Sequence, residues 1–240
     1  MPEARQDKTY IAENTDAAWK GIAMSKLFHG IHAFQKKIFP KQRNHFEKLA
    51  HGQNPSTLFI TCSDSRIVPE LLTQSEPGEL FVLRNAGNLV PPFGDVSGGE
   101  AATIEYAVAV LKVEQIVVCG HSHCGAITGL MRPDTLQGLP AVEQWLQHAS
   151  KVRQEILEKV DERQPDCDML MAAIKCNALV QLGHLRTYPA VAEAIERGTL
   201  SLHAWYYRFE TGEVLVYDES TDKFIPVSIE TAMPSEAIVA

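Results

Sequence analysis

Apolar residues spaced three and four positions apart run from Met24 to His51, at Leu27, Phe28, Ile31, Phe34, Ile38, Phe46 and Leu49. This spacing is typical of an amphipathic helix, and Pro40 interrupts it, so the pattern predicts two helices broken at that residue. The residues before this segment are polar and lack a period. We therefore expect an N-terminal arm over residues 1–23 that is poorly ordered or wraps a partner subunit.

Three short apolar runs rich in β-forming residues follow, and turn-forming residues bound them. They cover residues 57–62, 80–84 and 115–120. Between the last two, residues 98–111 have the apolar spacing of a helix, with predicted buried positions at Ala102, Ile104, Tyr106, Ala107 and Val110. Strand, helix and strand in this order predict a parallel sheet with right-handed crossovers.

The second half of the chain is mostly helical in pattern, with segments at about 139–160, 167–184 and 189–197. Two final apolar runs, residues 202–209 and 214–217, flank a Thr-Gly turn and predict a hairpin at one sheet edge. The predicted fold is thus a single α/β domain over residues 24–240. Its sheet is mostly parallel and four-stranded, with an added edge strand or hairpin, and helices flank it.

Composition narrows the function classes. The chain has 240 residues, 45% of them apolar and 22% charged, which is typical of a globular protein large enough to bury a core without a structural metal. A net charge of −8 without a basic stripe argues against a nucleic-acid surface. No apolar run long enough for a membrane span or a signal peptide is present, so we expect neither membrane insertion nor export. The five cysteines are irregularly spaced, which favours thiolate chemistry or metal ligation over disulfides.

The candidate chemistry lies where two predicted strands end. Cys62 ends the first strand, and His121 and Cys124 follow the third. Because the carboxyl ends of parallel strands meet at one edge of a sheet, two thiols and an imidazole should converge there. Taken alone, Cys62 is more easily explained as a small buried residue, which is also how we interpret Cys119. The joint arrangement instead predicts one catalytic zinc per chain, because three protein ligands leave one tetrahedral position open.

Asp64 and Arg66 follow Cys62 in the same short loop and are predicted to form a charge-assisted pair. A salt bridge that only fixes the loop would explain the pair. Beside a zinc ion, Asp64 would also accept a hydrogen bond from zinc-bound water or hydroxide, while Arg66 holds the carboxylate away from the metal. The two interpretations are compatible.

These residues carry a family resemblance. The strings Cys62-x-Asp64-x-Arg66 and His121-x-x-Cys124 resemble the β-class carbonic anhydrases, above all the plant and cyanobacterial branch. The resemblance runs from about Lys26 to Tyr217 and includes the longer strings at 77–85, 104–108 and 199–207. It implies that the two cysteines and the histidine bind zinc and that Asp64 and Arg66 form the catalytic dyad.

The resemblance also implies a substrate pocket. It places Gln53, Phe81 and Tyr106 around the substrate, with Gln53 and Tyr106 reaching in from a partner subunit, and it places Gly125 where substrate approaches the backbone. Structural alternatives are a turn for Gln53, core packing for the two aromatic residues and helix entry for Gly125. The bicarbonate-regulated branch has a Trp three residues before its first zinc cysteine, where this chain has Phe59. An open, constitutively active site is therefore expected.

The implied activity is that of a carbonate dehydratase, a zinc lyase: reversible hydration of carbon dioxide to bicarbonate and a proton by attack of zinc-bound hydroxide. Two thiolates weaken the zinc as an electrophile, so activity should rise above neutral pH. His123 and Tyr106 are candidate proton relays. The resemblance further implies a homodimer or a dimer-based higher oligomer. We expect a cytoplasmic location, with a carboxysome as the alternative.

Three alternatives remain at this point. The substrate could be a carbon dioxide analogue such as carbonyl sulfide or carbon disulfide, as in a few relatives of the family. The chain could instead be a zinc-stabilised module that binds bicarbonate or serves as a scaffold without turnover, although an intact Asp64–Arg66 pair argues against this. A thiol redox protein is disfavoured because the chain has no Cys-x-x-Cys pair.

Overall fold

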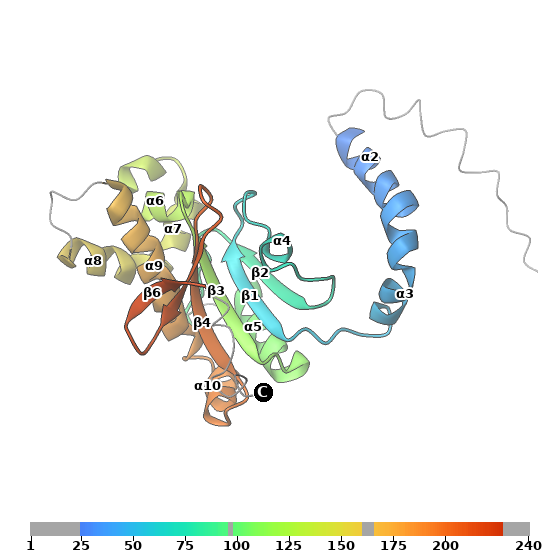
Figure 1. Cartoon of the computed structure of the whole chain (residues 1–240). Helices are drawn as coiled ribbons and strands as arrows, with labels where there is room; N and C mark the ends of the chain where they lie inside the picture. The colour runs from blue at the N-terminus through green and yellow to red at the C-terminus, as the bar shows by residue number, and fades with distance from the viewer. Residues whose placement is uncertain (1–24, 96–97, 160–165, 228–240) are drawn as a thin grey trace, which may run out of the picture. The chain divides into compact units, whose positions relative to one another are not determined.

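The computed structural model describes residues 25–95, 98–159 and 166–227 (Figure 1). It divides into two compact units, Met1–Gln53 and Asn54–Ala240. The predicted arm over residues 1–23 lies outside the described residues. The prediction of one domain over residues 24–240 stays a prediction.

The first unit is helical from Ser25 to Leu49. Helix α2 (Ser25–Ala33), the π-helical segment η1 (Phe34–Ile38) and helix α3 (Phe39–Leu49) follow one another without a gap. The predicted break at Pro40 is therefore wrong. Pro40 lies in the first turn of α3, where a missing N–H is tolerated, and the wide π-helical turn directly precedes it.

The described part of this unit has an apolar side but forms no core. The rings of Phe34, Phe39 and Phe46 lie 5.5–6.2 Å apart, centroid to centroid. From residue 26 to residue 53 no side chain is fully buried. The described part of the unit therefore does not bury its own apolar face.

The second unit is built on a six-stranded sheet with strand order β2-β1-β3-β4-β5-β6. The first four strands in that order are parallel and the last two pairings are antiparallel. The prediction of a mostly parallel four-stranded sheet with an added edge hairpin is confirmed, and β6 is one strand more than expected. The strands are β1 (Thr57–Cys62), β2 (Leu80–Asn85), β3 (Gln115–His121), β4 (Ser201–Tyr207), β5 (Val214–Asp218) and β6 (Lys223–Pro226).

The helices of this unit agree with the predicted segments and add short ones. They are α4 (Pro69–Thr73), α5 (Gly99–Glu105) with its π-helical continuation η2 (Tyr106–Leu111), α6 (Gly125–Met131), the 3-10 turn η3 (Pro133–Leu136), α7 (Pro140–Leu146), η4 (Gln147–Ala149), α8 (Ser150–Lys159), α9 (Asp166–Leu185) and α10 (Pro189–Glu196). Helices α5, α9 and α10 contribute side chains to a core with one face of the sheet. No helix in the described ranges is both long and apolar enough to cross a membrane.

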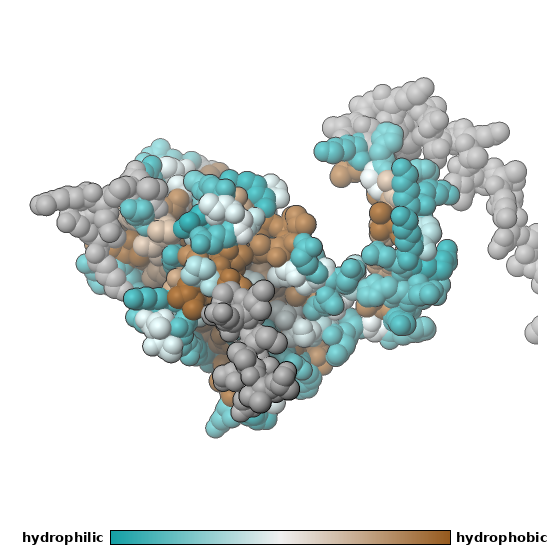
Figure 2. Space-filling model, in the orientation of Figure 1, coloured by the Kyte–Doolittle hydropathy of each residue, from teal (hydrophilic) through white to brown (hydrophobic). Residues whose placement is uncertain are grey.

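Alternate residues of the central strands point to opposite faces of the sheet, as the period of a strand requires. Leu58 and Ile60 of β1 join the core under α5, α9 and α10. Phe59 and Val117 instead belong to a small cluster on the other face, with Trp205 of β4 packed against it. On the side shown in Figure 2, apolar side chains gather over the strands.

In the helix at 99–111, the observed burial differs in part from the predicted burial. Ile104 and Ala107 are buried as expected, but Ala102 is exposed, and Tyr106 and Val110 keep 45% and 59% of their surface. The helix carries two apolar stripes, of which only one faces the sheet. The other, at positions four residues apart, presents Tyr106 and Val110 to the surface of this unit.

Gly120 allows α9 to lie close to β3, directly before His121. A Cβ added there would lie 2.7 Å from Cγ2 of Ile174 and 3.4 Å from its carbonyl oxygen. Because a β-branched residue has little rotamer freedom in a helix, Gly120→Ala should lower the free energy of unfolding by about 1–3 kcal/mol, measured by urea denaturation. Gly183→Ala on α9 is the control, since its Cβ would meet nothing within 4 Å. Equal stability of Gly120→Ala and the wild type would contradict this account of the packing.

Candidate metal centre

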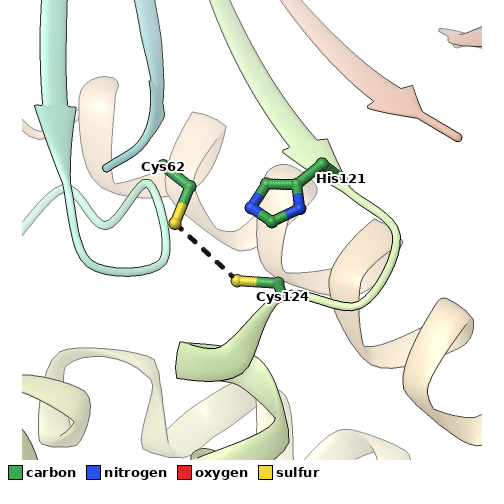
Figure 3. Close-up of side chains that lie close together, drawn as sticks. All are labelled: Cys62, His121 and Cys124. Carbon is green, nitrogen blue, oxygen red and sulfur yellow. Dashed lines mark hydrogen bonds between the residues drawn. The ribbon is translucent and has the colours of Figure 1, made fainter. Parts of the chain in front are cut away.

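Two adjacent parallel strands deliver the three predicted ligands to one place. Strand β1 ends at Cys62, its neighbour β3 ends at His121, and Cys124 immediately precedes α6. One potential ligand atom from each of the three buried side chains lies within 4.8 Å of the others (Figure 3). The convergence predicted from the strand ends is therefore present.

The donor set fits zinc. The Sγ atoms of Cys62 and Cys124 are 3.9 Å apart. His121 donates its Nδ1–H to the carbonyl oxygen of Ser122 at 2.8 Å, which leaves the Nε2 lone pair for a ligand. Nε2 is buried and has no hydrogen-bond partner in the described part of the chain. Because buried polar atoms are normally satisfied, two sulfurs and an unpartnered imidazole nitrogen favour a metal that accepts both donor types.

The hydrogen bond between the two thiols shifts their pKa values in opposite directions. Hydrogen bonding from Cys124 lowers the pKa of Cys62 well below its ordinary value, although burial opposes this shift. The same interaction and burial raise the pKa of Cys124. Because zinc binds cysteine as the thiolate, the lowered pKa of Cys62 favours metal ligation, and metal binding would release the proton held by Cys124. Burial raises the pKa of Cys119, so that side chain stays a neutral thiol.

Asp64 and Arg66 form the predicted pair, and it is bidentate. Arg66 donates from Nε to Oδ1 at 2.9 Å and from a terminal nitrogen to Oδ2 at 2.7 Å, and its backbone N–H also reaches Oδ1. The guanidinium holds the pKa of Asp64 well below its usual range, so the carboxyl is an anion. Oδ2 lies 4.0 Å from Nε2 of His121, which places the carboxylate beside the ligand cluster.

Arg84 of β2 fixes the loop that carries these residues, and sequence reasoning missed it. It donates to the backbone carbonyls of Cys62, Asp64 and Ile67 at 2.7–3.0 Å. The sequence did offer a signal for Arg84, because it is a charged residue near the end of an apolar strand. The register of the sheet places Arg84 opposite Thr61. Its three carbonyl contacts hold the turn between the first ligand and the carboxylate.

Two buried amides of α9 support the other side of Cys62, and these were also missed. Gly87 donates its N–H to Sγ of Cys62 at 3.4 Å. Asn177 donates to the carbonyl of Gly87 at 2.9 Å, and Gln181 accepts the N–H of Val90 at 2.8 Å. The signal was two amides four residues apart among mostly apolar neighbours on α9. They fix the loop that hydrogen-bonds the thiolate.

The structure places two of the predicted pocket residues, Phe81 and Tyr106, away from the cluster of their own chain. Phe81 pairs with Leu58, four residues before Cys62, which is about 13 Å along the strand. Tyr106 lies against Phe81, with ring centroids 6.0 Å apart. Gln53 belongs to the first unit.

Gly125 directly follows the ligand Cys124. A Cβ at this position would meet nothing within 4 Å, so packing inside the chain does not require a glycine. The open space that this leaves is compatible with the predicted approach of substrate to the backbone.

Comparison with known proteins agrees with this geometry. A family model described as carbonic anhydrase matches residues 57–214. Carbonic anhydrase of Synechocystis sp. is 48% identical over 203 residues, covering 84% of this chain and 74% of the relative. The enzyme of Pseudomonas aeruginosa is 46% identical over 205 residues, covering 85% and 92%. The solved structure of the β-carbonic anhydrase CcaA superposes with a TM-score of 0.83 at 48% identity, covering 85% of this chain and 99% of that one.

Fold, ligand cluster and relatives together define the class: the chain belongs to the β-class carbonic anhydrases. It is a zinc-dependent enzyme that catalyses the reversible hydration of carbon dioxide to bicarbonate and a proton. The resemblance noted in the sequence, including its cyanobacterial character, is thereby confirmed.

Proposed function

We propose that carbon dioxide is hydrated at the cluster of Cys62, His121 and Cys124, with Asp64 and Arg66 as the catalytic dyad. The observation that carries this assignment is the unpartnered, buried Nε2 of His121 between two thiols and a carboxylate held by a guanidinium. A site built only for stability would be expected to enclose its metal with four protein ligands.

Each side chain then has a role. When bound, zinc supplies a hydroxide nucleophile near neutral pH. Arg66 occupies both carboxylate oxygens of Asp64 and so fixes the direction of the remaining Oδ2 lone pair. Asp64, anionic because its pKa is lowered, accepts a hydrogen bond from the nucleophile and orients its attack.

A second copy of the chain completes the pocket in this proposal. Gln53 and Tyr106 would reach into the site of the partner. Phe81, which was expected around the substrate without a partner role, would join them there because its ring lies against Tyr106 and away from the cluster of its own chain. The aromatic rings would exclude water, and Gln53 would donate to bicarbonate. Three observations support an assembly based on dimers. The ring of Tyr106 is exposed and lies against the half-buried Phe81. No side chain from residue 26 to residue 53 is fully buried, and relatives from Sordaria macrospora have structures that are described as tetrameric.

Substitution at Gln53 tests the role of the partner. Gln53→Ala should keep one zinc per chain and the oligomeric state, yet lower kcat about 10-fold or more through loss of one donor at the reacting oxygen. Stopped-flow hydration and analytical ultracentrifugation measure both quantities, and Gln144→Ala, exposed on α7, is the matched control. Full activity of Gln53→Ala, or of an isolated monomer, would contradict a pocket shared between subunits.

We infer a cytoplasmic location, with a carboxysome as the alternative compartment. The two ligand thiols lie 3.9 Å apart and must stay reduced, which a reducing compartment ensures. Immunogold labelling of cells would distinguish diffuse cytoplasmic enzyme from enzyme packed in carboxysomes, and recovery from a periplasmic extract would contradict both.

Stopped-flow assays on the zinc-loaded protein test the proposed chemistry. Carbon dioxide should be hydrated far above the buffer background, and carbonyl sulfide or carbon disulfide should be turned over poorly. The reverse preference would show that the substrate is an analogue. Zinc binding with no turnover of either would indicate a binding or scaffold module.

A further inference from the structure

The loop between β4 and β5, residues 208–213, lies against the loop that carries two of the ligands. This follows from topology, because β3 and β4 are adjacent parallel strands and both loops leave the same edge of the sheet. Ser122 continues the ladder by donating its N–H to the carbonyl of Tyr207 at 2.9 Å. Two residues of the β4–β5 loop, Phe209 and Glu210, have no role in the assignment above.

Glu210 bridges the two residues that separate His121 from Cys124. Ser122 donates its hydroxyl to Oε2 of Glu210 at 2.9 Å, and the same hydroxyl accepts the N–H of Phe209 at 2.9 Å. His123 donates Nε2–H to Oε1 of the same carboxylate. One side chain therefore spans the connection between the two ligands.

Phe209 links this bridge to the ligand and to the dyad. Its ring centroid lies 4.9 Å from that of His121, and the guanidinium carbon of Arg66 lies 4.6 Å from the same centroid. Arg66 also donates to the carbonyl oxygen of His123 at 3.1 Å. The β4–β5 loop thus contacts a metal ligand, the ligand loop and the residue that holds Asp64.

The ligand loop needs such support at one residue. His123 has φ = +54°, in the left-handed region that is unfavourable for residues other than glycine. Its side chain is held by Glu210 and its carbonyl by Arg66. Both contacts thus hold the residue with the unfavourable backbone conformation between the two predicted ligands.

We propose that Glu210 is a positioning residue of the metal site, which acts by fixing Ser122 and His123 and thereby the spacing of the ligands and the orientation of Arg66. This inference rests on the proposed function of the cluster. Glu210 contacts neither the ligand atoms nor the predicted substrate position, so it acts through its neighbours.

An ordinary surface ion pair is the competing explanation, and it makes a different prediction. The side chains of His123 and Glu210 are 60% and 49% exposed. A pair this exposed contributes little to stability, so its loss would leave the metal site unchanged. A positioning role instead moves metal affinity and kcat while the melting temperature stays nearly constant.

The test compares Glu210→Ala with Glu213→Ala, a control in the same loop whose carboxylate pairs with Arg208 at 2.9 Å. Zinc affinity is measured by competition with a chromophoric chelator, kcat and KM by stopped flow, and ligand geometry by the visible spectrum of the cobalt(II)-substituted protein. Glu210→Ala should weaken zinc binding about 10-fold, lower kcat at nearly unchanged KM and shift the cobalt spectrum. Glu210→Gln, which keeps hydrogen-bonding atoms for both partners, should recover most of each property.

A second variant removes the hydrogen-bond partner of Glu210 in the ligand loop. Ser122→Ala removes the hydroxyl that donates a hydrogen bond to Glu210. In a double-mutant cycle, the loss of zinc affinity in Ser122→Ala/Glu210→Ala should therefore be smaller than the sum of the two single losses. Additive effects, a wild-type zinc affinity in Glu210→Ala, or an equal loss in Glu213→Ala would overturn the inference. If the wild type itself bound no zinc, the proposed function would fail instead.

Discussion

Cys62→Ala is expected to lose its zinc and its hydration activity together. The substitution leaves one imidazole and one thiol, a donor set too small to hold the ion against a chelator. Activity should fall to the buffer background in stopped-flow assays, and metal analysis should find far less than one zinc per chain. The fold should survive, because the apolar cluster that the sheet forms with α5, α9 and α10 contains none of the three predicted ligands.

Cys119→Ala is the matched control for this experiment. Cys119 is a fully buried thiol in β3, two residues before His121, and it lies in the apolar cluster that contains Phe59 and Val117. Its replacement should preserve zinc and turnover. Retention of full zinc and activity in Cys62→Ala would show that the ligands have been assigned incorrectly, and complete unfolding on zinc loss would indicate a structural metal.

Arg66→Ala is expected to keep its zinc and lose hydration activity by about 100-fold. Without the guanidinium, the Asp64 carboxylate loses both side-chain hydrogen bonds that hold it. Oδ2 already lies 4.0 Å from Nε2 of His121, so a small rotation would bring it to the metal as a fourth ligand, at about 2.0–2.2 Å. The position needed by the nucleophile would then be filled.

Asp64→Ala tests the orienting role of the carboxylate separately from its movement onto the metal. It should also lose activity, by about 10–100-fold, but with an open metal position, because only the acceptor that directs the nucleophile is gone. Crystal structures of both zinc-loaded variants distinguish the two cases. If Arg66→Ala kept an open coordination position on zinc and near-normal turnover, the Asp64–Arg66 pair would be only a salt bridge that fixes the loop.

The convergence of Cys62, His121 and Cys124 was predictable because each part had a strong local signal. Apolar runs bounded by turn residues located β1 and β3, and the parallel topology then required Cys62 and His121 to meet at one edge. Short helices were harder to predict, since α4 and α6, with five and seven residues, contain too few turns to show a period.

The errors at Pro40 and in the helix at 99–111 have separate physical causes. Pro40 lies in the first turn of α3, directly after a π-helical segment, where its missing N–H does not break the helix. The helix at 99–111 carries two apolar stripes, and the sheet buries only one of them. The supporting residues of the site were missed for a different reason. Arg84, Asn177 and Glu210 act through contacts with residues 17 to 90 positions away, which a local pattern does not reveal.

The rate of carbon dioxide hydration during zinc titration of the metal-free protein tests the central claim most directly. If the Cys62, His121 and Cys124 cluster holds a catalytic zinc, the stopped-flow rate should rise linearly up to one zinc per chain and then remain constant. A rate that stays at the buffer background after one zinc has bound would contradict the account.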